Sequence, residues 1–540
     1  MKLTIDQGKA LSGILKFIQK PINEYKDCAV ILYAAAGCGK TFLTRFIADK
    51  LRGKYTIAGV APTHKARKVL DSFLNNASFY TIKTMTVASL LSKLRSHSYI
   101  GTKNYKGTGT KIELFELFII DEASMINDED VKNIILYAFK HKRKLIFVGD
   151  KYQIPNPTQK FICENGFAYK ADSSIFNIQG FELTTNIRQK KGNPIIPIYL
   201  EFRNAIAEKR EPNIERIDNI KDKQGVKFYT EKEDWYLQIT EIYLNAENLH
   251  DIRIIAYTND AIKTHNSRIR KLFNRGFSPE VGELLMGYNN VGFPQPYISN
   301  GQDYYIIKVN EKNTHQILSF YNLSGLIVKL KECDTNIQSI IFIPDIGKNN
   351  NQKILQELVK RAQKVNSFKS TKMDYKKYCD IRNKMIFMEN IYKYQEEIIG
   401  ESAFRSTHPL LFKRVDEVIN YEEQIVLNNK LSIDIQEKYG SILSERLRDD
   451  KVFSNVEKLC DSFCVIEKDI DYGYAITSHK SQGSTYETVF IDEPDFDKLK
   501  DHYNYKLNCE VKTVKEKNQL KYVSFTRPTD SAYVFYREII

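Results

Sequence analysis

A turn of small residues near the N-terminus carries the groups needed to bind a nucleotide. The apolar run CAVILYAAA precedes it, and the amphipathic helical pattern FLTRFIADKL follows it. In a turn between a buried strand and a helix, the main-chain N–H groups of Gly37, Cys38, Gly39 and Lys40 can converge on phosphate oxygens. The Lys40 ammonium can then reach the β and γ phosphates, and the Thr41 hydroxyl can bind Mg²⁺.

Acidic and amide side chains follow two further apolar runs. Asp121 and Glu122 come directly after LFELFII; we expect Asp121 to hold Mg²⁺ through its water shell and Glu122 to orient and deprotonate the attacking water. After KLIFVGD, Gln153 could sense the γ phosphate. The usual phosphate-binding pattern begins with a glycine where this chain has Ala34. A binding protein with a decayed ATP site is therefore an alternative.

The elements that position these residues follow from the runs themselves. Continuous apolar runs are typical of parallel strands buried on both faces, and each is followed here by a helical pattern. Ligands of parallel α/β sheets collect where the strands end, at their carboxyl edge. The sequence therefore predicts an α/β fold that brings the phosphate, metal and sensor residues to one edge of a sheet.

The composition favours a multidomain globular protein with a polyanionic partner. The chain has 540 residues, of which 42% are hydrophobic, and 80 basic against 67 acidic residues give a net charge of +13. Such a surface attracts nucleic-acid phosphates. No segment approaches the roughly 20 uninterrupted apolar residues of a membrane span, and MKLTIDQGKALSG lacks a secretory signal. We expect a soluble, intracellular protein.

The eight cysteines are scattered, and only Cys460 and Cys464 lie close together. A tetrahedral zinc site would need a second such pair. We therefore expect reduced thiols, most of them structural.

The order of the motifs resembles that of superfamily 1 helicases, within the SF1B branch that contains RecD, Pif1 and the phage Dda helicases. LTIDQGKA resembles the Q motif, which implies that Gln7 recognises adenine; without the family, Gln7 would be interpreted as a helix-start residue. GVAPTHKARKVL resembles motif Ia, and TVASLL resembles the next strand-binding segment, with Ala88 where a histidine is expected. The nucleic-acid contacts implied in these two segments are Pro62, Thr63, His64, Lys65 and Thr86.

The resemblance extends to the second half of the motor. FELTTNIRQ resembles motif IV, so Arg188 would touch the γ phosphate from across the cleft, and LKYVSFTRPTD resembles motif VI, with Arg527 as the second arginine finger. RIIAYTNDAIKTHNSRIR and ITSHKSQGSTYETVFID resemble the opening of the second motor domain and motif V. The further nucleic-acid contacts implied are Thr258, Asn259, Thr477, His479, Lys480 and Ser481; the further nucleotide contacts are Phe42, Gln482 and Gly483.

The resemblance implies two RecA-like P-loop NTPase domains with two inserts. Motor domain 1A would comprise residues 1–92 and 114–190, and motor domain 2A residues 191–280 and 466–540. Residues 93–113 would form a β-hairpin insert, 1B: either a pin with Tyr99 or Tyr105 as a wedge, or a mobile loop. Insert 2B, residues 281–465, would combine an SH3-like barrel with a helical extension from 348. That extension could be an arm closing over the nucleic-acid strand or a lineage-specific decoration.

The function that the resemblance implies is that of an ATP-dependent DNA helicase using ATP and Mg²⁺. It would translocate on single-stranded DNA from 5′ to 3′ and act on forked duplex, together with replication proteins such as a single-strand binding protein. An ATPase that strips proteins or remodels RNA is a second interpretation. Usage rich in Lys, Asn, Ile and Tyr suggests an A+T-rich, viral or phage genome.

Overall fold

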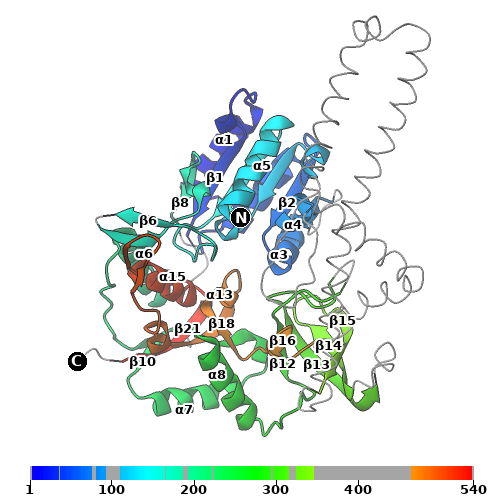
Figure 1. Ribbon diagram of the computed structural model, residues 1–540, viewed down its shortest axis with the longest axis vertical. Helices are drawn as coiled ribbons and strands as arrows, with labels where there is room; N and C mark the ends of the chain where they lie inside the picture. Colours follow the sequence, from blue (N-terminus) through cyan, green and yellow to red (C-terminus); the bar gives the residue numbers. More distant parts are fainter. Residues whose placement is uncertain are drawn as a thin grey trace, which may run out of the picture.

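The structure is a computed structural model. It describes residues 3–35, 37–75, 81–92, 110–164, 166–185, 192–221, 224–292, 296–314, 324–345 and 464–537. Figure 1 shows two α/β lobes, one above the other, with an antiparallel sheet beside the lower lobe. Within the described ranges, every helix is too short or too polar to cross a membrane.

A six-stranded parallel sheet forms the core of the N-terminal lobe, in the order β3-β2-β4-β5-β1-β8. The apolar runs recognised in the sequence form its central strands, because only such runs can be buried on both faces. The strands are β1 (Ala29–Ala34), β2 (Ile57–Ala61), β3 (Lys83–Thr86), β4 (Leu117–Ile120), β5 (Lys144–Gly149) and β8 (Gly180–Leu183).

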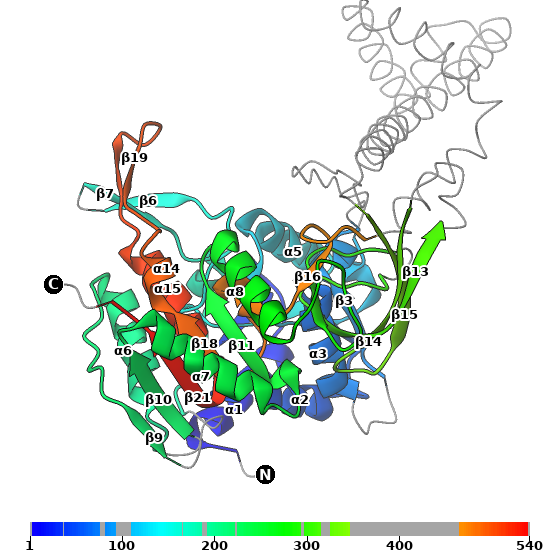
Figure 2. The same ribbon diagram turned by 90° about the horizontal axis from the view of Figure 1, so that it is seen from below.

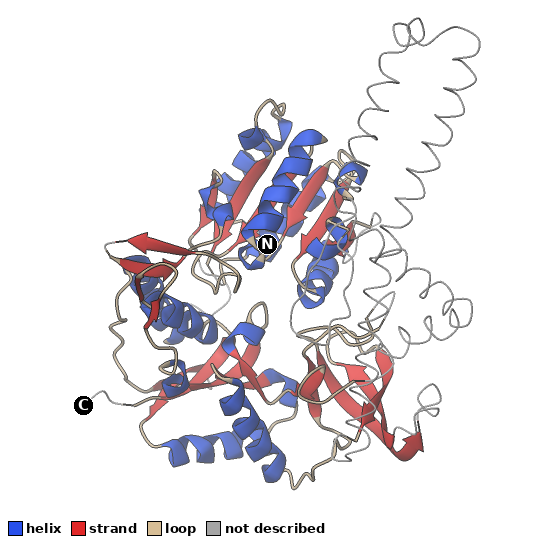
Figure 3. Cartoon of the chain, in the orientation of Figure 1, coloured by secondary structure: helices blue, strands red, loops and turns tan. Residues whose placement is uncertain are grey.

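Helices cover both faces of this sheet (Figure 3). Ile14, Ile47 and Leu70 of α1, α2 and α3 belong to the core on one face, whereas Ile134 of α5 and Leu90 of α4 belong to the core on the other. The elements are α1 (Ile5–Gln19), α2 (Lys40–Leu51), α3 (His64–Asn75), α4 (Val87–Leu90), α5 (Asp128–Lys140), and the 3₁₀ turns η1 (Tyr25–Asp27), η2 (Ile112–Leu114), η3 (Ala123–Met125) and η4 (Ser174–Asn177).

A second six-stranded sheet, in the order β17-β11-β18-β21-β10-β9, forms the other lobe. Its pairs are parallel except for the edge pair β9 and β10. The strands are β9 (Asn219–Lys221), β10 (Gln224–Tyr229), β11 (Ile252–Ala256), β17 (Ala475–Thr477), β18 (Tyr486–Asp492) and β21 (Pro528–Phe535).

Helices again pack on both faces of the second sheet. Trp235 and Ile262 lie in the core on one face, and Phe202 and Leu520 in the core on the other. The elements are α6 (Ile195–Glu208), α7 (Lys232–Leu244), η5 (Leu249–Asp251), α8 (Asn259–Leu272), α13 (Ser478–Ser481), α14 (Glu493–Phe496) and α15 (Val514–Phe525). The predicted α/β fold with a RecA-like parallel-sheet core is confirmed.

The third sheet is antiparallel and five-stranded, in the order β15-β14-β13-β12-β16. Its strands are β12 (Leu284–Gly287), β13 (Asp303–Thr314), β14 (Ser324–Glu332), β15 (Gln338–Pro344) and β16 (Ile470–Tyr472). An antiparallel sheet occupies the start of the predicted 2B insert, and the SH3-like barrel stays a prediction. The predicted helical extension lies almost wholly outside the described residues, as do residues 93–109 of the predicted hairpin with Tyr99 and Tyr105.

A fourth, four-stranded sheet joins segments far apart in the chain, in the order β19-β20-β7-β6. Its strands are β6 (Phe161–Glu164), β7 (Phe167–Lys170), β19 (His502–Asn504) and β20 (Cys509–Val511). Figure 2 shows the hairpin of β19 and β20 projecting beside the hairpin of β6 and β7. The sheet therefore contains strands from both the N-terminal and the C-terminal part of the motor.

Candidate nucleotide and nucleic-acid site

The turn between β1 and α2 has the geometry of a phosphate-binding loop. Gly37 and Gly39 have φ angles of 82° and 75°, a region that glycine enters with little strain. Lys40 begins α2, so the N–H groups of the first helical turn have no partner within the helix. The Lys40 ammonium donates a hydrogen bond to the Ala34 carbonyl oxygen at 3.2 Å. Because this partner is neutral, a phosphate would replace it with a stronger, charge-assisted bond.

Gln7 is attached to this turn from α1. Its side chain is 2% exposed, and its Nε2 donates to the Cys38 carbonyl oxygen at 3.3 Å. The Thr4 main-chain N–H donates to Gln7 Oε1 at 3.1 Å, as part of a capping box. A primary amide has two donor hydrogens and two acceptor lone pairs. One of each is left after these two bonds, which matches the donor and acceptor pair that adenine presents.

Asp121 and Glu122 stand where β4 ends, close to the phosphate turn. Burial and the neighbouring charge of Glu122 raise the pKa of Asp121 to about 7, and the charge of Lys40 opposes this rise. Glu122 has a φ of 48°, and its Oε2 is buried without a hydrogen-bond partner. A buried carboxylate oxygen without a donor is costly. A water molecule between Glu122 and a phosphate would supply that donor.

The residues after β5 connect the two lobes. Asp150 is 1% exposed and accepts a hydrogen bond from the Tyr522 hydroxyl of α15 at 2.9 Å. Gln153 is 3% exposed, and its Oε1 accepts a hydrogen bond from Gln482 Nε2 of motif V at 3.0 Å. The predicted sensor of the first lobe therefore contacts a predicted nucleotide-binding residue of the second lobe directly.

Of the two predicted arginine fingers, the structure describes only Arg527. Arg188 lies outside the described residues. Arg527 is 2% exposed, and its guanidinium donates to the carbonyl oxygens of Ser484 at 2.9 Å and Val523 at 3.0 Å. In this arrangement Arg527 is engaged within the second lobe, beneath the motif V loop. Its role as a finger stays a prediction.

Arg203 was missed by sequence reasoning. It lies on α6, 4.6 Å from the centre of the Tyr152 ring, and its Nη2 is 3.7 Å from Glu182 Oε1. Burial raises the pKa of the Cys38 thiol to about 11, and the positive charges of Lys40 and Arg203 oppose this rise. A cation from the second lobe therefore acts on the phosphate turn. The available signal was a single arginine in the largely apolar helical segment IIPIYLEFRNAIAE.

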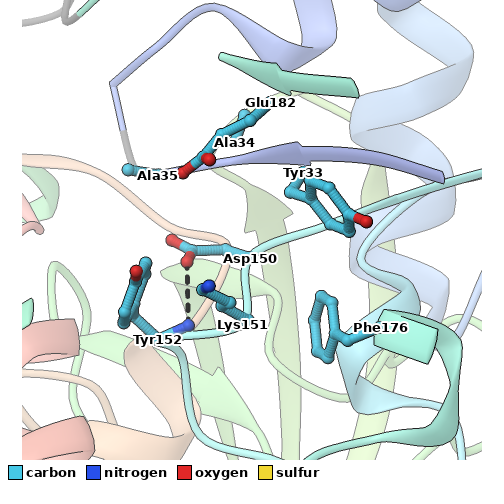
Figure 4. Close-up of a pocket in the computed structure, with 8 residues that line it drawn as sticks. All are labelled: Tyr33, Ala34, Ala35, Asp150, Lys151, Tyr152, Phe176 and Glu182. Carbon is cyan, nitrogen blue, oxygen red and sulfur yellow. Dashed lines mark hydrogen bonds between the residues drawn. The ribbon is translucent and has the colours of Figure 1, made fainter. Parts of the chain in front are cut away.

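A small pocket opens at the carboxyl edge of the first sheet, beside the phosphate turn (Figure 4). Its volume is about 170 Å³, and its lining includes Ala34, Asp150 and Tyr152. Tyr33 and Phe176 form its aromatic side, with ring centroids 6.3 Å apart. Two of its lining residues, Asp150 and Tyr152, also contact Tyr522 of the second lobe.

Residues predicted to bind the nucleic-acid strand meet the ATP site in a second cavity, of about 200 Å³. Thr63 and Lys65 line it from the first lobe, and His479 and Lys480 line it from the second. Glu122, Gln482 and Gly483 line the same cavity. Gly483 has a φ of 81°, a backbone conformation that residues with a Cβ rarely adopt, and a Cβ placed there would contact Glu122 Oε1 at an ordinary distance of 4.0 Å.

Two of these cavity residues have further contacts. Burial lowers the pKa of His479, which favours a neutral imidazole. The Lys480 ammonium donates to Asn300 Oδ1 at 2.5 Å and lies 4.8 Å from the centre of the Tyr288 ring. Asn300 and Tyr288 were not singled out in the sequence, because nothing in their local pattern shows that the insert approaches motif V.

The other predicted strand contacts are spread over several helix starts. The hydroxyls of Thr86, Thr258 and Thr477 each accept a main-chain hydrogen bond as an N-cap. Ser481 is fully buried and donates to the Ser478 carbonyl oxygen at 2.8 Å, so it does not line the cavity with its neighbours. Pro62 and His64 flank Thr63 at the start of α3, Asn259 is exposed at the start of α8, and Thr41 and Phe42 are half-buried in the first turn of α2.

The residues present fit a magnesium nucleotide. The phosphate turn offers two glycines with positive φ, a lysine and the start of a 12-residue helix. Thr41 and Asp121 supply the hydroxyl and carboxylate oxygens that Mg²⁺ prefers. Across the described ranges, no group of three or more His, Cys, Asp and Glu side chains could hold a metal ion. Phosphate oxygens and water would therefore have to complete the coordination of Mg²⁺.

Comparison with known proteins gives two family matches. The AAA domain family matches residues 19–230, and the UvrD-like helicase C-terminal domain family matches residues 472–507. The first range contains the phosphate turn, the acidic pair and the sensor region, and the second contains motif V.

Two relatives are viral. An uncharacterized protein of Acanthamoeba polyphaga mimivirus is 26% identical over 522 residues, covering 88% of this chain and 91% of that protein. The ATP-dependent DNA helicase Dda of Enterobacteria phage T4 is 26% identical over 296 residues, covering 53% of this chain and 60% of that protein.

Among solved structures, a Pif1 helicase from Bacteroides in complex with ADP-AlF3 and single-stranded DNA is 14% identical. The match covers 99% of this chain and 92% of that chain, with a TM-score of 0.44.

The fold and the site define an ATP-hydrolysing enzyme of the P-loop class. The predicted resemblance to superfamily 1 helicases of the Dda, RecD and Pif1 branch is confirmed by the two family matches and by the similarity to Dda.

Proposed function

We propose that this protein is an ATP-dependent DNA helicase that translocates on single-stranded DNA and unwinds duplex DNA. The name of the phage relative supports ATP-dependent action on DNA. The basic balance of the chain, +13, favours a nucleic-acid partner. We further propose travel from 5′ to 3′, as the resemblance to the SF1B branch implies.

One observation carries this proposal: a single cavity is lined by Glu122 of the ATP site and by the predicted strand contacts Thr63, Lys65, His479 and Lys480. A nucleic-acid strand held there would lie within contact range of the residue proposed to activate water. ATP hydrolysis and strand binding can then influence each other through direct contacts, without a long pathway.

The proposed cycle uses the contacts between the lobes. ATP would bind to Lys40 on one side and draw Arg188 and Arg527 from the other, which closes the cleft; hydrolysis would release them. The hydrogen bond between Gln153 and Gln482 is one closing contact already in place. For Arg527 to reach the nucleotide, its hydrogen bond to the Ser484 carbonyl oxygen must break. Binding of Arg527 to the nucleotide would therefore be coupled to a change in the motif V loop.

The remaining assignments are also part of the proposal. ATP and Mg²⁺ are the proposed cofactors, with Thr41 and Asp121 on the metal and Gln7 on the adenine. Residues 1–92 with 114–190 and residues 191–280 with 466–540 would be the two motor domains. The antiparallel sheet of β12 to β16 would belong to an SH3-like module beside the strand. Forked DNA is the proposed substrate, and a single-strand binding protein is a proposed partner.

The proposal is tested by ATP hydrolysis with and without single-stranded DNA. Lys40→Ala and Glu122→Gln should each remove nearly all DNA-stimulated turnover, while single-strand binding survives. Lys50→Ala and Glu129→Gln change exposed residues of α2 and α5 and should keep turnover. Normal turnover in either site variant would refute the assignment.

A separate assay distinguishes the rival activities. Strand displacement on forked DNA, on forked RNA and on DNA carrying a bound protein should require ATP and occur on forked DNA. Protein removal without strand separation would favour the protein-stripping ATPase, and activity on RNA alone would favour the RNA-remodelling enzyme. Strand binding by a protein that does not hydrolyse ATP would favour the binding subunit with a decayed site.

A further inference from the structure

The four-stranded sheet connects the two motor lobes. Its strands come from chain segments separate from the phosphate turn. β7 comes from the segment between β5 and β8, and it pairs in parallel with β20 from the C-terminal part. The stem of the β6–β7 hairpin is fixed to the first lobe: Asn156 Nδ2 donates to the Met125 carbonyl oxygen at 2.7 Å, and the Ser174 N–H donates to Asp128 Oδ1 at 2.8 Å.

The other side of the hairpin is attached to the second lobe by ion pairs. Lys170 lies 2.9 Å from Glu516, and Asp172 lies 2.8 Å from Lys515, both on α15. Lys170 and Glu516 are largely covered, Lys515 is buried, and Asp172 is exposed to solvent. Ion pairs are non-covalent contacts, which can break and form again. The joint formed by this sheet is therefore held by contacts that can open when the lobes move.

Two thiols meet across this joint. Cys163 of β6 is exposed and Cys509 of β20 is partly exposed, and their sulfur atoms are 3.6 Å apart. The register pairs Cys163 with Ala168, and Ala168 with Val511. Since side chains alternate along a strand, Cys509 and Val511 share a face with Ala168 and Cys163. The methyl group of Ala168 leaves room for the two sulfur atoms above β7.

We propose that Cys163 and Cys509 form a site of reversible oxidation, at which a peroxide-class oxidant joins the two motor lobes through a disulfide. With hydrogen peroxide, one thiolate attacks a peroxide oxygen, which breaks the O–O bond, gives a sulfenic acid and releases hydroxide that is protonated to water. The second thiol displaces the sulfenic oxygen as water and forms the S–S bond. Two thiols are thereby oxidised, one peroxide is reduced to two waters, and a thiol reductant reverses the step.

The cross-link requires a movement of the backbone as well as of the side chains. A disulfide has an S–S distance of about 2.05 Å and brings the two Cα atoms to within about 6.8 Å. Because β7 lies between β6 and β20, their backbones are about two strand spacings apart, and the hairpins must shift toward each other while the sulfur atoms approach by roughly 1.5 Å. Once formed, the bond would hold β6–β7 of the first lobe against β19–β20 of the second. If ATP turnover requires movement between the lobes, which rests on the proposed function, the oxidised protein would be locked.

The first experiment tests the site itself. The full chain is treated with hydrogen peroxide, free thiols are alkylated, and tryptic peptides are identified by mass spectrometry. A disulfide-linked pair of peptides containing Cys163 and Cys509 is the expected product, and reduction should release it. The pair should be lost in Cys163→Ser and in Cys509→Ser but retained in Cys333→Ser, a partly exposed thiol elsewhere. Sulfinic acid at Cys163 without a cross-link, or two unmodified thiols, would overturn the proposal.

The second experiment tests the effect on the motor. Peroxide should lower DNA-stimulated ATP turnover of the wild type by about tenfold or more, because a motion that limits turnover is blocked, and reductant should restore it. Cys163→Ser should keep its turnover under peroxide. Undiminished turnover of verified cross-linked protein would refute the lock. A reduced protein without any ATP turnover would instead refute the proposed function, while the cross-link would still be judged by mass spectrometry.

Discussion

A buried ion cluster joins the first lobe, the second lobe and the antiparallel sheet. We predict that disrupting it lowers the free energy of unfolding substantially. Asp303 of β13 is 1% exposed; its Oδ2 lies 2.7 Å from Arg253 Nη2, 3.3 Å from His250 Nε2 and 4.0 Å from Lys65 Nζ. Burial alone would raise the pKa of Asp303, but the charges of Arg253 and Lys65 hold it well below its usual range. Arg253 is fully buried.

The perturbation is Asp303→Asn, which keeps the shape and removes the charge. At 2.7 Å and an effective dielectric constant of about 20, the Coulomb attraction is about 6 kcal/mol. Asparagine keeps an oxygen of similar size beside Arg253, but the arginine charge is left buried without its counterion. Breaking a buried pair in this way costs about 3 to 5 kcal/mol. We expect that loss in the free energy of unfolding of the second lobe.

The assay is urea unfolding followed by tryptophan fluorescence. Trp235 is the single tryptophan of the chain and is buried in the second lobe, so its emission reports that lobe. With an m-value of about 3 kcal/mol/M, the midpoint should fall by about 1 M or more. Glu280→Gln, in a partly exposed pair with Arg275, should change the midpoint far less.

A second variant separates the lost charge from the lost contact. Replacing Arg253 and Asp303 together by Met and Leu removes both charges and should recover most of the stability, because a buried ion pair is often no better than apolar packing. A midpoint shift below about 0.3 M for Asp303→Asn would refute the reasoning, and so would a double variant less stable than Asp303→Asn.

Three further outcomes are expected. Affinity for single-stranded DNA should fall about a thousandfold between roughly 50 and 200 mM salt, with little sequence preference; a flat response in a filter-binding titration would indicate a protein partner instead. Gln482→Ala leaves buried Gln153 without its partner at 3.0 Å, a loss of about 1 to 3 kcal/mol; DNA-stimulated turnover should fall at least tenfold, whereas exposed Thr485→Ala should retain it. Burial raises the pKa of Asp471 to about 6, so the folded state holds its proton more tightly than the unfolded chain and loses stability as pH rises to about 6. Asp471→Asn should therefore raise the melting temperature at pH 8 and change it little at pH 4, and equal shifts at both values would contradict this.

The phosphate site could be predicted because its signal is local. The strand-forming run before Gly37 and the helical run after Lys40 are neighbours in the sequence. The short turn between them must therefore lie where the strand ends, at the carboxyl edge of a parallel sheet. The same holds for Asp121 and Glu122, which follow directly on a run that can only be buried. These residues lie together because strand ends meet at one edge of a sheet.

Contacts between distant segments could not be predicted, since their partners are set by the fold. β6, β7, β19 and β20 are strands of three or four residues, too short for a clear alternation, and Cys163 and Cys509 are separated by 346 positions. Arg203 has an ordinary helical setting in the sequence, and only the packing of α6 against Tyr152 gives it a role. Arg527 follows the end of α15. The sequence around it does not indicate that its guanidinium binds carbonyl oxygens of the second lobe.

We propose that ATP hydrolysis between the two lobes drives DNA unwinding with a fixed direction. The most direct test is strand displacement on two otherwise identical duplexes, one with a 5′ single-stranded tail and one with a 3′ tail, with ATP and with a non-hydrolysable analogue. We expect displacement of the 5′-tailed duplex with ATP only. Displacement of the 3′-tailed duplex alone would contradict the direction, and displacement of neither duplex by a protein that hydrolyses ATP on single-stranded DNA would contradict the helicase itself.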